Sequence, residues 1–225
     1  MSSDADRREA FLRRMAPEQD ETLSAMDERA RTAGFPHVGP VVGGLLYQFA
    51  RMIDAERVFE FGSGFGYSAY WFARAVGPDG EVVLTEVDAD ELADAREYLA
   101  AGGLAERARF EVGDAMATIE DTDGPIDVAL IDHDKERYWD AFEAVRPKLA
   151  EEAIVVADNA MRAGPVVVFE DLARLTAGED VPDATDETRA VAEYLGRVRN
   201  EPAFTTVVLP VGSGIAVSYR DGSDT

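Results

Sequence analysis

The sequence predicts an α/β protein whose core is a doubly wound, mainly parallel sheet with an antiparallel hairpin at its C-terminal end. Short apolar runs alternate with helix-length segments from residue 41 to residue 175, which is the pattern of parallel strands joined by helical crossovers. Two β-rich runs separated by the turn sequence PVGSG close the chain and indicate the hairpin. At 225 residues the chain is expected to form a single domain, residues 1–225.

The expected elements follow from local patterns. Residues 1–33 are charged, with scattered apolar positions, and are expected to form one or two helices that flank the core. Gly and Pro mark a turn over residues 34–40, and two glycines end the helix of residues 88–101. An acidic loop is expected over residues 176–189, and a polar tail over residues 221–225. The other expected helices are residues 41–53, 67–76, 137–149, 166–175 and 190–199, and the expected strands are residues 58–61, 81–86, 109–112, 126–131, 154–157, 204–209 and 215–219.

The composition excludes several classes of function. A net charge of −23 argues against a nucleic-acid substrate, because Lys and Arg side chains that neutralise phosphates supply most of that affinity. No stretch reaches the ~18 apolar residues of a membrane span, and the first residues are polar and acidic rather than signal-like. The absence of cysteine excludes disulfides and thiolate metal sites. We expect a cytoplasmic protein with no nucleic-acid or membrane partner.

The basic residues are almost all arginine. Lys135 and Lys148 are the only lysines among 22 basic residues, against 45 acidic ones. Scarce lysine with a large excess of acid indicates adaptation to high salt, where screening relieves the self-repulsion of such a charge. A moderately acidic protein from a mesophile with a GC-rich genome is the alternative.

A glycine-rich turn lies where a nucleotide-like cofactor would bind. Gly62, Gly64 and Gly66 separate the apolar run of residues 58–61 from a helix, so that the backbone can approach a ligand at the helix N-terminus. Glu86 ends the next strand 20 residues after Gly66, where nucleotide-binding α/β units keep an acid for the ribose hydroxyls. An ordinary tight turn is the alternative interpretation.

The charge of this turn favours one cofactor over another. Glu60 precedes the turn, which contains neither arginine nor lysine, so a pyrophosphate such as that of NAD would gain little there. S-adenosylmethionine has a ribose, a sulfonium and an ammonium group, and its cationic end suits an acidic turn. The residues favour S-adenosylmethionine, with an NAD-dependent oxidoreductase as the alternative.

Polar residues follow five consecutive predicted strands, at the sheet edge where open α/β sheets bind ligands. Carboxylate and amide oxygens there suit Mg²⁺, Mn²⁺ or Ca²⁺, and a lysine near a metal can act as a general base or an electrostatic partner. Turn and cap roles are the alternative for the acids and the asparagine, and a solvated position for the lysine. After the glycine turn and Glu86, these residues are Asp114, then Asp132, His133 and Lys135, and finally Asp158 and Asn159.

The segments FEFGSGFGYSA, LIDHDKERY, VVADNA and LPVGSGI together resemble the cation-dependent class I S-adenosylmethionine O-methyltransferases, which include the caffeoyl-CoA and catechol enzymes. The resemblance runs from about residue 34 to residue 220. It implies a Rossmann-like, seven-stranded, mainly parallel sheet whose last strand is antiparallel. It also implies S-adenosyl-L-methionine and a divalent cation, most simply Mg²⁺, as cofactors, and a homodimer.

The resemblance also implies a role for individual residues. Lys135 would be the catalytic lysine, and Asp132, Asp158 and Asn159 the metal ligands. On the methionine side the cofactor would contact Glu60, Gly62, Gly66 and Ser68, at the ribose Glu86, and by the adenine Gly113, Asp114, Ala115 and His133. Gly64 and Asp132 would be further cofactor contacts, and Val38 lies where the N-terminal segment folds over the cofactor.

The expected function is methyl transfer to a hydroxyl of a small vicinal dihydroxy aromatic acceptor. Asp134 stands where animal catechol enzymes carry a tryptophan, and the strand of residues 204–209 lacks their substrate-binding carboxylate, so the acceptor contacts differ from theirs. The acidic loop of residues 176–189 disfavours an anionic coenzyme A thioester. A non-catalytic S-adenosylmethionine-binding module is a second alternative.

The charge generates a prediction about salt. Raising NaCl or KCl from ~0.1 M, where the Debye length is ~10 Å, towards molar concentrations should raise the melting temperature, because repulsion among the acidic side chains is screened. Thermal unfolding followed by circular dichroism over this range measures the effect. A melting temperature that stays flat or falls would contradict adaptation to salt and would leave the predicted enzyme class untouched.

Overall fold

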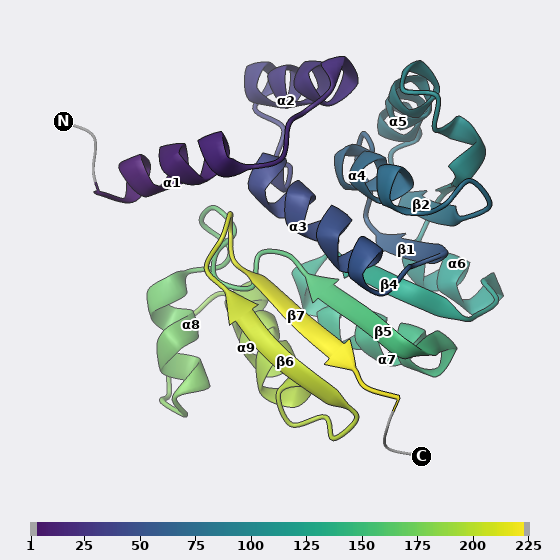
Figure 1. Ribbon diagram of the computed structural model, residues 1–225. Helices are drawn as coiled ribbons and strands as arrows, with labels where there is room; N and C mark the ends of the chain where they lie inside the picture. Colours follow the sequence, from purple (N-terminus) through teal and green to yellow (C-terminus); the bar gives the residue numbers. More distant parts are fainter. Residues whose placement is uncertain (1–3, 223–225) are drawn as a thin grey trace.

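The computed structural model describes residues 4–222, which form a mixed sheet with helices on both faces (Figure 1). The first five strands along the chain run parallel to one another. The last strand along the chain pairs antiparallel with both the fifth and the sixth. The predicted fold class is confirmed. In the described residues the seven strands lie in the order β3 (Ala108–Val112), β2 (Glu81–Glu86), β1 (Arg57–Phe61), β4 (Ile126–Ile131), β5 (Leu149–Ala157), β7 (Ile215–Arg220) and β6 (Phe204–Leu209).

Successive strand residues build a core on each face of the sheet. Val58 belongs to a buried cluster with helices of one face, and the next residue, Phe59, belongs to a cluster with helices of the other. This alternation is the two-residue period of a strand, and covering both faces explains the nearly continuous apolar runs. The first face carries α3 (Gly39–Met52), α4 (Tyr67–Ala75) and α5 (Ala89–Ala101); the second carries α6 (Ala115–Asp121), α7 (Tyr138–Val145) and α9 (Asp186–Val198).

Two helices precede the core, in agreement with the prediction for residues 1–33. Helix α2 (Glu21–Ala33) buries Leu23, Met26 and Ala30 against the first cluster, whereas α1 (Asp4–Met15) extends away from the sheet (Figure 1). Residues 1–3 of this segment and residues 223–225 of the predicted tail lie outside the described part of the chain. Within that part, no helix combines the length and the apolar character needed to cross a bilayer.

The boundary between α7 and β5 differs from the prediction. The helix expected over residues 137–149 ends at Val145, and after a 3₁₀ turn at Arg146–Lys148 the strand begins at Leu149 rather than at residue 154. Leu149 pairs with Ile126, and the register then shifts before Val128 pairs with Ile154. Glu151 and Glu152 are exposed in this irregular part of β5, which is why their sequence is not strand-like.

Two further differences concern helices. The predicted acidic loop of residues 176–189 is shorter, because α9 begins at Asp186, where Thr185 caps it and Asp186 and Glu187 lie in its first turn. Acids there are favourable at the positive end of the helix dipole, so the charge marks a helix start. Helix α8 covers Phe169–Thr176, so it begins three residues later than predicted. The seven-residue α6 was too short for its periodicity to be predicted.

Candidate active site

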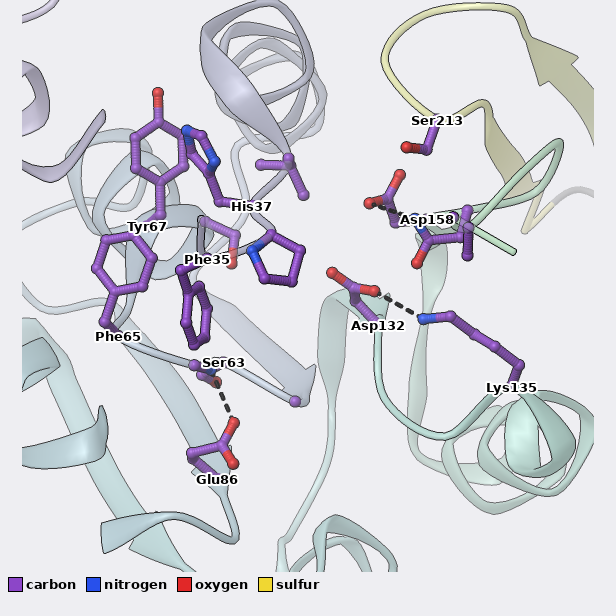
Figure 2. A pocket seen from close by; sticks show the side chains of 18 of the residues that line it. Phe35, His37, Ser63, Phe65, Tyr67, Glu86, Asp132, Lys135, Asp158 and Ser213 are labelled. Carbon is purple, nitrogen blue, oxygen red and sulfur yellow. Dashed lines mark hydrogen bonds and ion pairs between the residues drawn. The ribbon is translucent and has the colours of Figure 1, made fainter. Parts of the chain in front are cut away.

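A cavity of about 690 Å³ opens at the carboxyl ends of the parallel strands. Figure 2 shows Phe35, Phe65 and Tyr67 on one side of it, and Asp132, Asp158 and Lys135 on the other. The sequence-predicted residues on its wall are Val38, Gly62, Gly64, Ser68, Glu86, Asp132, Lys135, Asp158 and Asn159.

Two of the glycines have a clear steric reason. Gly62 has φ 86°, and a Cβ atom on it would lie 2.6 Å from the carbonyl oxygen of Asp132, so only glycine lets β1 and β4 end so close together. Gly66 has φ 82°, and its Cβ would lie 2.7 Å from that of Ala95. Gly66 is therefore a packing position between α4 and α5, and it is not on the cavity wall.

Glu60 places a buried acid behind the glycine turn. It is 0% exposed, and neither carboxylate oxygen has a hydrogen-bond partner at normal geometry. Burial raises the pKa of Glu60 to about 8, while the hydroxyls of Ser68 and Ser63 oppose the shift. Both serines line the cavity, so a cationic group bound against them would favour the ionised form of Glu60.

Glu86 holds the glycine turn in place and also faces the cavity. Its Oε2 atom accepts a hydrogen bond of 2.9 Å from the backbone N–H of Gly64, and Oε1 accepts one of 3.1 Å from Asp88. A carboxylate can accept about four hydrogen bonds, so the acceptor capacity for ribose hydroxyls remains.

The residues predicted to contact adenine are not on the cavity wall. Asp114 caps α6 through the N–H of Met116 and pairs with both terminal nitrogens of Arg137, at 3.1 and 3.0 Å, and the Arg137 guanidinium lowers the pKa of Asp114. Gly113 donates its N–H to the carbonyl of Glu86, which joins β3 to β2. Ala115 starts α6 and is buried. Asp114 thus has the cap role that the sequence left open as an alternative.

His133 is the least satisfied of this group. Both ring nitrogens are buried without a hydrogen-bond partner, and the ring stacks on Tyr138 with centroids 5.9 Å apart. Burial lowers the pKa of His133 to about 4, which keeps the ring neutral at physiological pH. His133 is not on the cavity wall, so neither nitrogen faces the cavity in this structure.

Asp132, Asp158 and Asn159 come together at the ends of β4 and β5. Asp158 is 5% exposed, and its Oδ1 atom is buried without a partner, while Oδ2 lies 3.4 Å from the amide nitrogen of Asn159. Burial, together with the negative charge of Asp132, raises the pKa of Asp158 to about 7. Burial also raises the pKa of Asp132, against the opposing effect of Lys135.

These oxygens fit a hard divalent cation. The unpartnered Asp158 oxygen is an open donor, and two carboxylates with one amide are the ligand chemistry of Mg²⁺ or Ca²⁺. Within residues 4–222 no group of three or more His, Asp or Glu is arranged to hold a metal. Any metal site here therefore depends on Asn159 as well as the two acids.

Lys135 lies beside Asp132 on the cavity wall. Its Nζ atom is 3.1 Å from Oδ1 of Asp132 and donates to the carbonyl of His133 at 3.0 Å (Figure 2). The side chain is 14% exposed. Of the two lysines in the chain, this one lines the cavity.

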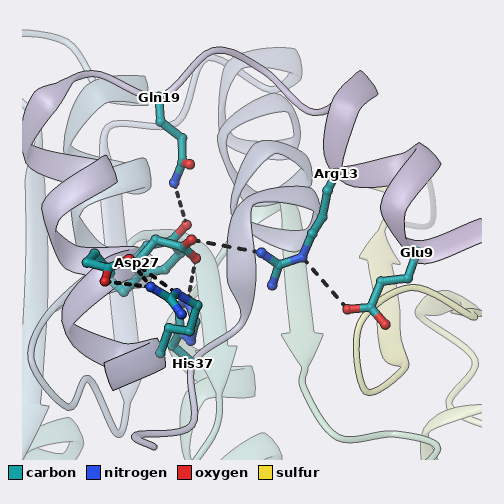
Figure 3. A network of polar contacts seen from close by, with 8 residues as sticks. Glu9, Arg13, Gln19, Asp27 and His37 are labelled. Atoms are coloured by element: carbon teal, nitrogen blue, oxygen red, sulfur yellow. Dashed lines mark hydrogen bonds and ion pairs between the residues drawn. The ribbon is translucent and has the colours of Figure 1, made fainter. Parts of the chain in front are cut away.

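The turn of residues 35–38 forms one wall of the cavity, and side chains of the N-terminal helices hold it in place. His37 bonds to Oδ1 of Asp27 at 2.9 Å, and Asp27 is 3.8 Å from Arg13 of α1 (Figure 3). Gln19 donates to the hydroxyl of Tyr67, whose ring packs edge-on against His37. The sequence predicted the turn of residues 34–40, but nothing in it indicated these partners.

Comparisons with known proteins agree with this geometry. The O-methyltransferase family model matches residues 21–221. A catechol O-methyltransferase of Mycobacterium tuberculosis is 32% identical over 166 residues, which cover 72% of this chain and 76% of that protein. A catechol O-methyltransferase of Niastella koreensis is 30% identical over 155 residues, 66% of this chain and 70% of that protein. The O-methyltransferase TomG of Streptomyces achromogenes, involved in tomaymycin synthesis and crystallised with S-adenosylmethionine (SAM), superimposes with a TM-score of 0.83 at 25% identity, over 98% of this chain and 100% of that one.

The position of Glu86 predicts its effect on cofactor affinity. Glu86→Ala should weaken SAM binding by ~1.5–3 kcal/mol, roughly 10- to 150-fold in Kd, because a charged hydrogen-bond acceptor is lost and the glycine turn is released. Isothermal titration calorimetry measures the change. Glu81→Ala is the matched control, because Glu81 begins the same strand at its opposite end and pairs with Arg57. Wild-type affinity in Glu86→Ala would remove Glu86 from the cofactor site.

Proposed function

Since this chain belongs to the O-methyltransferase family and its fold matches a SAM-bound enzyme, we propose that it methylates a hydroxyl of a small vicinal dihydroxy aromatic held by a divalent cation. The observation that carries the acceptor class is the pair of neighbouring acids, Asp132 and Asp158, with an unpartnered oxygen at the cavity wall. Two relatives named catechol O-methyltransferase support it.

The cofactor side of the site is acidic and closely surrounded by backbone. Glu60, Ser63 and Ser68 would hold the cationic methionine end, because a buried acid with two hydroxyls beside it favours a positive group. Gly62 and Gly64 let the backbone approach the ligand, and Glu86 would hold the ribose. The aromatic rings of Phe35 and Phe65 pack edge to face, with their centroids 5.2 Å apart, and would shield this side of the cavity from water.

The acceptor side is where the hard oxygens gather. Asp132, Asp158 and Asn159 would hold the cation, with Mg²⁺ the first choice and Mn²⁺ or Ca²⁺ as alternatives. Such an ion supplies a lowered pKa for a phenolic hydroxyl and a fixed orientation for two vicinal oxygens. Tyr138 steadies this edge, because its hydroxyl donates to the carbonyl of Asp158 at 3.1 Å.

Lys135 is the proposed catalytic residue. Methyl transfer forms an oxygen–carbon bond, breaks the sulfur–carbon bond of the cofactor and requires the phenolic proton to leave. The Lys135 amine lies at the cavity wall beside Asp132 and is positioned to take that proton or to stabilise the resulting negative charge. The methyl group is already activated in SAM, so orientation of the two reactants accounts for much of the remaining acceleration.

Metal removal tests the acceptor side. EDTA should abolish methylation of a catechol, and added Mg²⁺ or Mn²⁺ should restore turnover. SAM affinity should stay largely intact in EDTA, because the proposed cation ligands lie on the opposite side of the cavity from Glu86. Asp158→Ala should reproduce the effect of EDTA, since few protein ligands remain. Product formation is measured by mass spectrometry across a panel of dihydroxy aromatics, with SAM binding by calorimetry. Full activity in EDTA would remove the metal from the chemistry.

The role of Lys135 is tested by two substitutions. Lys135→Ala should lower kcat by ~10²–10⁴-fold, the usual contribution of a positioned proton-transfer group. Lys135→Arg should not recover it, because a guanidinium stays protonated. Lys148→Ala is the control, since the Lys148 amine binds the carbonyls of Glu120 and Thr122 away from the cavity. A fully active Lys135→Arg variant would instead make Lys135 a fixed positive charge.

A further inference from the structure

The loop between β5 and α8, residues 158–168, forms the cavity wall beside the proposed cation ligands. It contains Asp158 and Asn159, and farther along it Ala163, Gly164 and Val166 also line the cavity. If the acceptor binds beside Asp158 and Asn159, as the proposed function requires, this loop lies against it. What fixes the conformation of the loop therefore bears on acceptor binding.

The first half of the loop is fixed by the turn between β6 and β7. The backbone N–H of Ala160 donates to the carbonyl of Gly214 at 2.8 Å, and those of Met161 and Arg162 donate to the carbonyl of Ser213 at 3.1 and 3.0 Å. These bonds lie next to the acids. They do not reach Val166, so another element must hold that part of the loop.

The second half is held by the N-terminal turn of α9. Thr188 is 0% exposed; its hydroxyl donates to the carbonyl of Val166 at 3.0 Å and accepts the N–H of Val168 at 3.1 Å. Thr185, the cap residue of the same helix, donates to the same Val166 carbonyl at 2.5 Å. One buried hydroxyl thus satisfies polar backbone groups on both sides of Val167.

The side chains between these bonds point in different directions. Val167 is fully buried and packs with Leu172 and Val191, and Ala163 and Val167 form a β-bridge. Val166, its neighbour, is 37% exposed and lies on the cavity wall. Burying Val167 and fixing the carbonyl of Val166 therefore determines where the Val166 side chain meets a ligand.

We propose that Thr188 is a positioning residue for the methyl acceptor, and that Val166, which it holds at the cavity wall, is a specificity-determining side chain. Thr188 does not line the cavity itself. Thr188 would affect acceptor binding through its bonds to the backbone of residues 166–168. It does not contact the cofactor side, which is built on β1, β2 and the turn of residues 35–38.

Kinetics of matched variants test the positioning role. Thr188→Val keeps the side-chain shape but loses the hydroxyl bonds to Val166, Val168 and Thr185. The KM for catechol should therefore rise roughly 10-fold, with the Kd for SAM unchanged. Thr188→Ser should restore the KM. Thr176→Val is the control, because the Thr176 hydroxyl bonds only within α8, to the carbonyls of Leu172 and Ala173. An unchanged KM, or an equal loss of SAM affinity, would overturn the proposal.

The specificity role has its own measurement. Val166→Ala should raise kcat/KM for a catechol with a bulky ring substituent, such as 4-tert-butylcatechol, relative to catechol itself. An unchanged ratio of the two values would remove Val166 from acceptor selection.

Hydrogen exchange separates this proposal from the proposed function. In Thr188→Val the amides of residues 166–168 should exchange faster than in the wild type, while those of β4 should not change. Unchanged exchange at residues 166–168 would overturn the positioning role, whichever acceptor the enzyme uses. Failure of the wild type to methylate any dihydroxy aromatic, with faster exchange in the variant, would overturn only the acceptor class and would support the anchoring of the loop by Thr188.

Discussion

Burial of negative charge at the carboxyl ends of β1, β4 and β5 is the constraint on which this site depends. Glu60 is fully buried without a hydrogen-bond partner, and Asp158 has one buried carboxylate oxygen without a partner. Asp132 is paired with Lys135. Because an unpaired buried carboxylate is costly, these acids keep their protons to a higher pH, about 8 for Glu60 and about 7 for Asp158. Cationic ligands are the complement of such a site: the sulfonium and ammonium groups of the cofactor on one side and, under the proposed function, a divalent ion on the other.

The same burial links stability to pH. The carboxyl group of Glu60 has an ordinary pKa of 4.5, and in the folded protein the pKa is about 8. Between these values the folded state holds a proton that the unfolded chain has released, so the contribution of Glu60 to the free energy of unfolding falls as pH rises. A cation bound beside Glu60 favours the ionised form and offsets this loss. Ligand binding and folding stability are thus coupled through one side chain.

Local patterns explain how much of this could be predicted from the sequence. The strands, the glycine turn and the acids at the strand ends are recognised from residues close together in the sequence. Apart from the start of β5, the strands were predicted almost to their boundaries. The short α6 and the irregular start of β5 lacked a clear period. The two other walls of the cavity depend on distant pairs, His37 with Asp27 and Thr188 with Val166, which no periodicity indicates. Asp114 shows the converse, because a strand-end acid can serve as a helix cap.

The two lysines show which kind of observation identifies a candidate catalytic residue. In a chain rich in arginine, a lysine stands out, yet Lys148 is as rare as Lys135 and has a structural role: its amine fits between the carbonyls of Glu120 and Thr122, at 2.8 and 2.7 Å. A compact ammonium with three donors suits converging carbonyls, which a planar guanidinium does not match. Lys135 also binds a carbonyl, that of His133, so rarity and this contact apply equally to both residues. What separates them is that Lys135 faces Asp132 at the cavity wall, where its amine can reach a ligand.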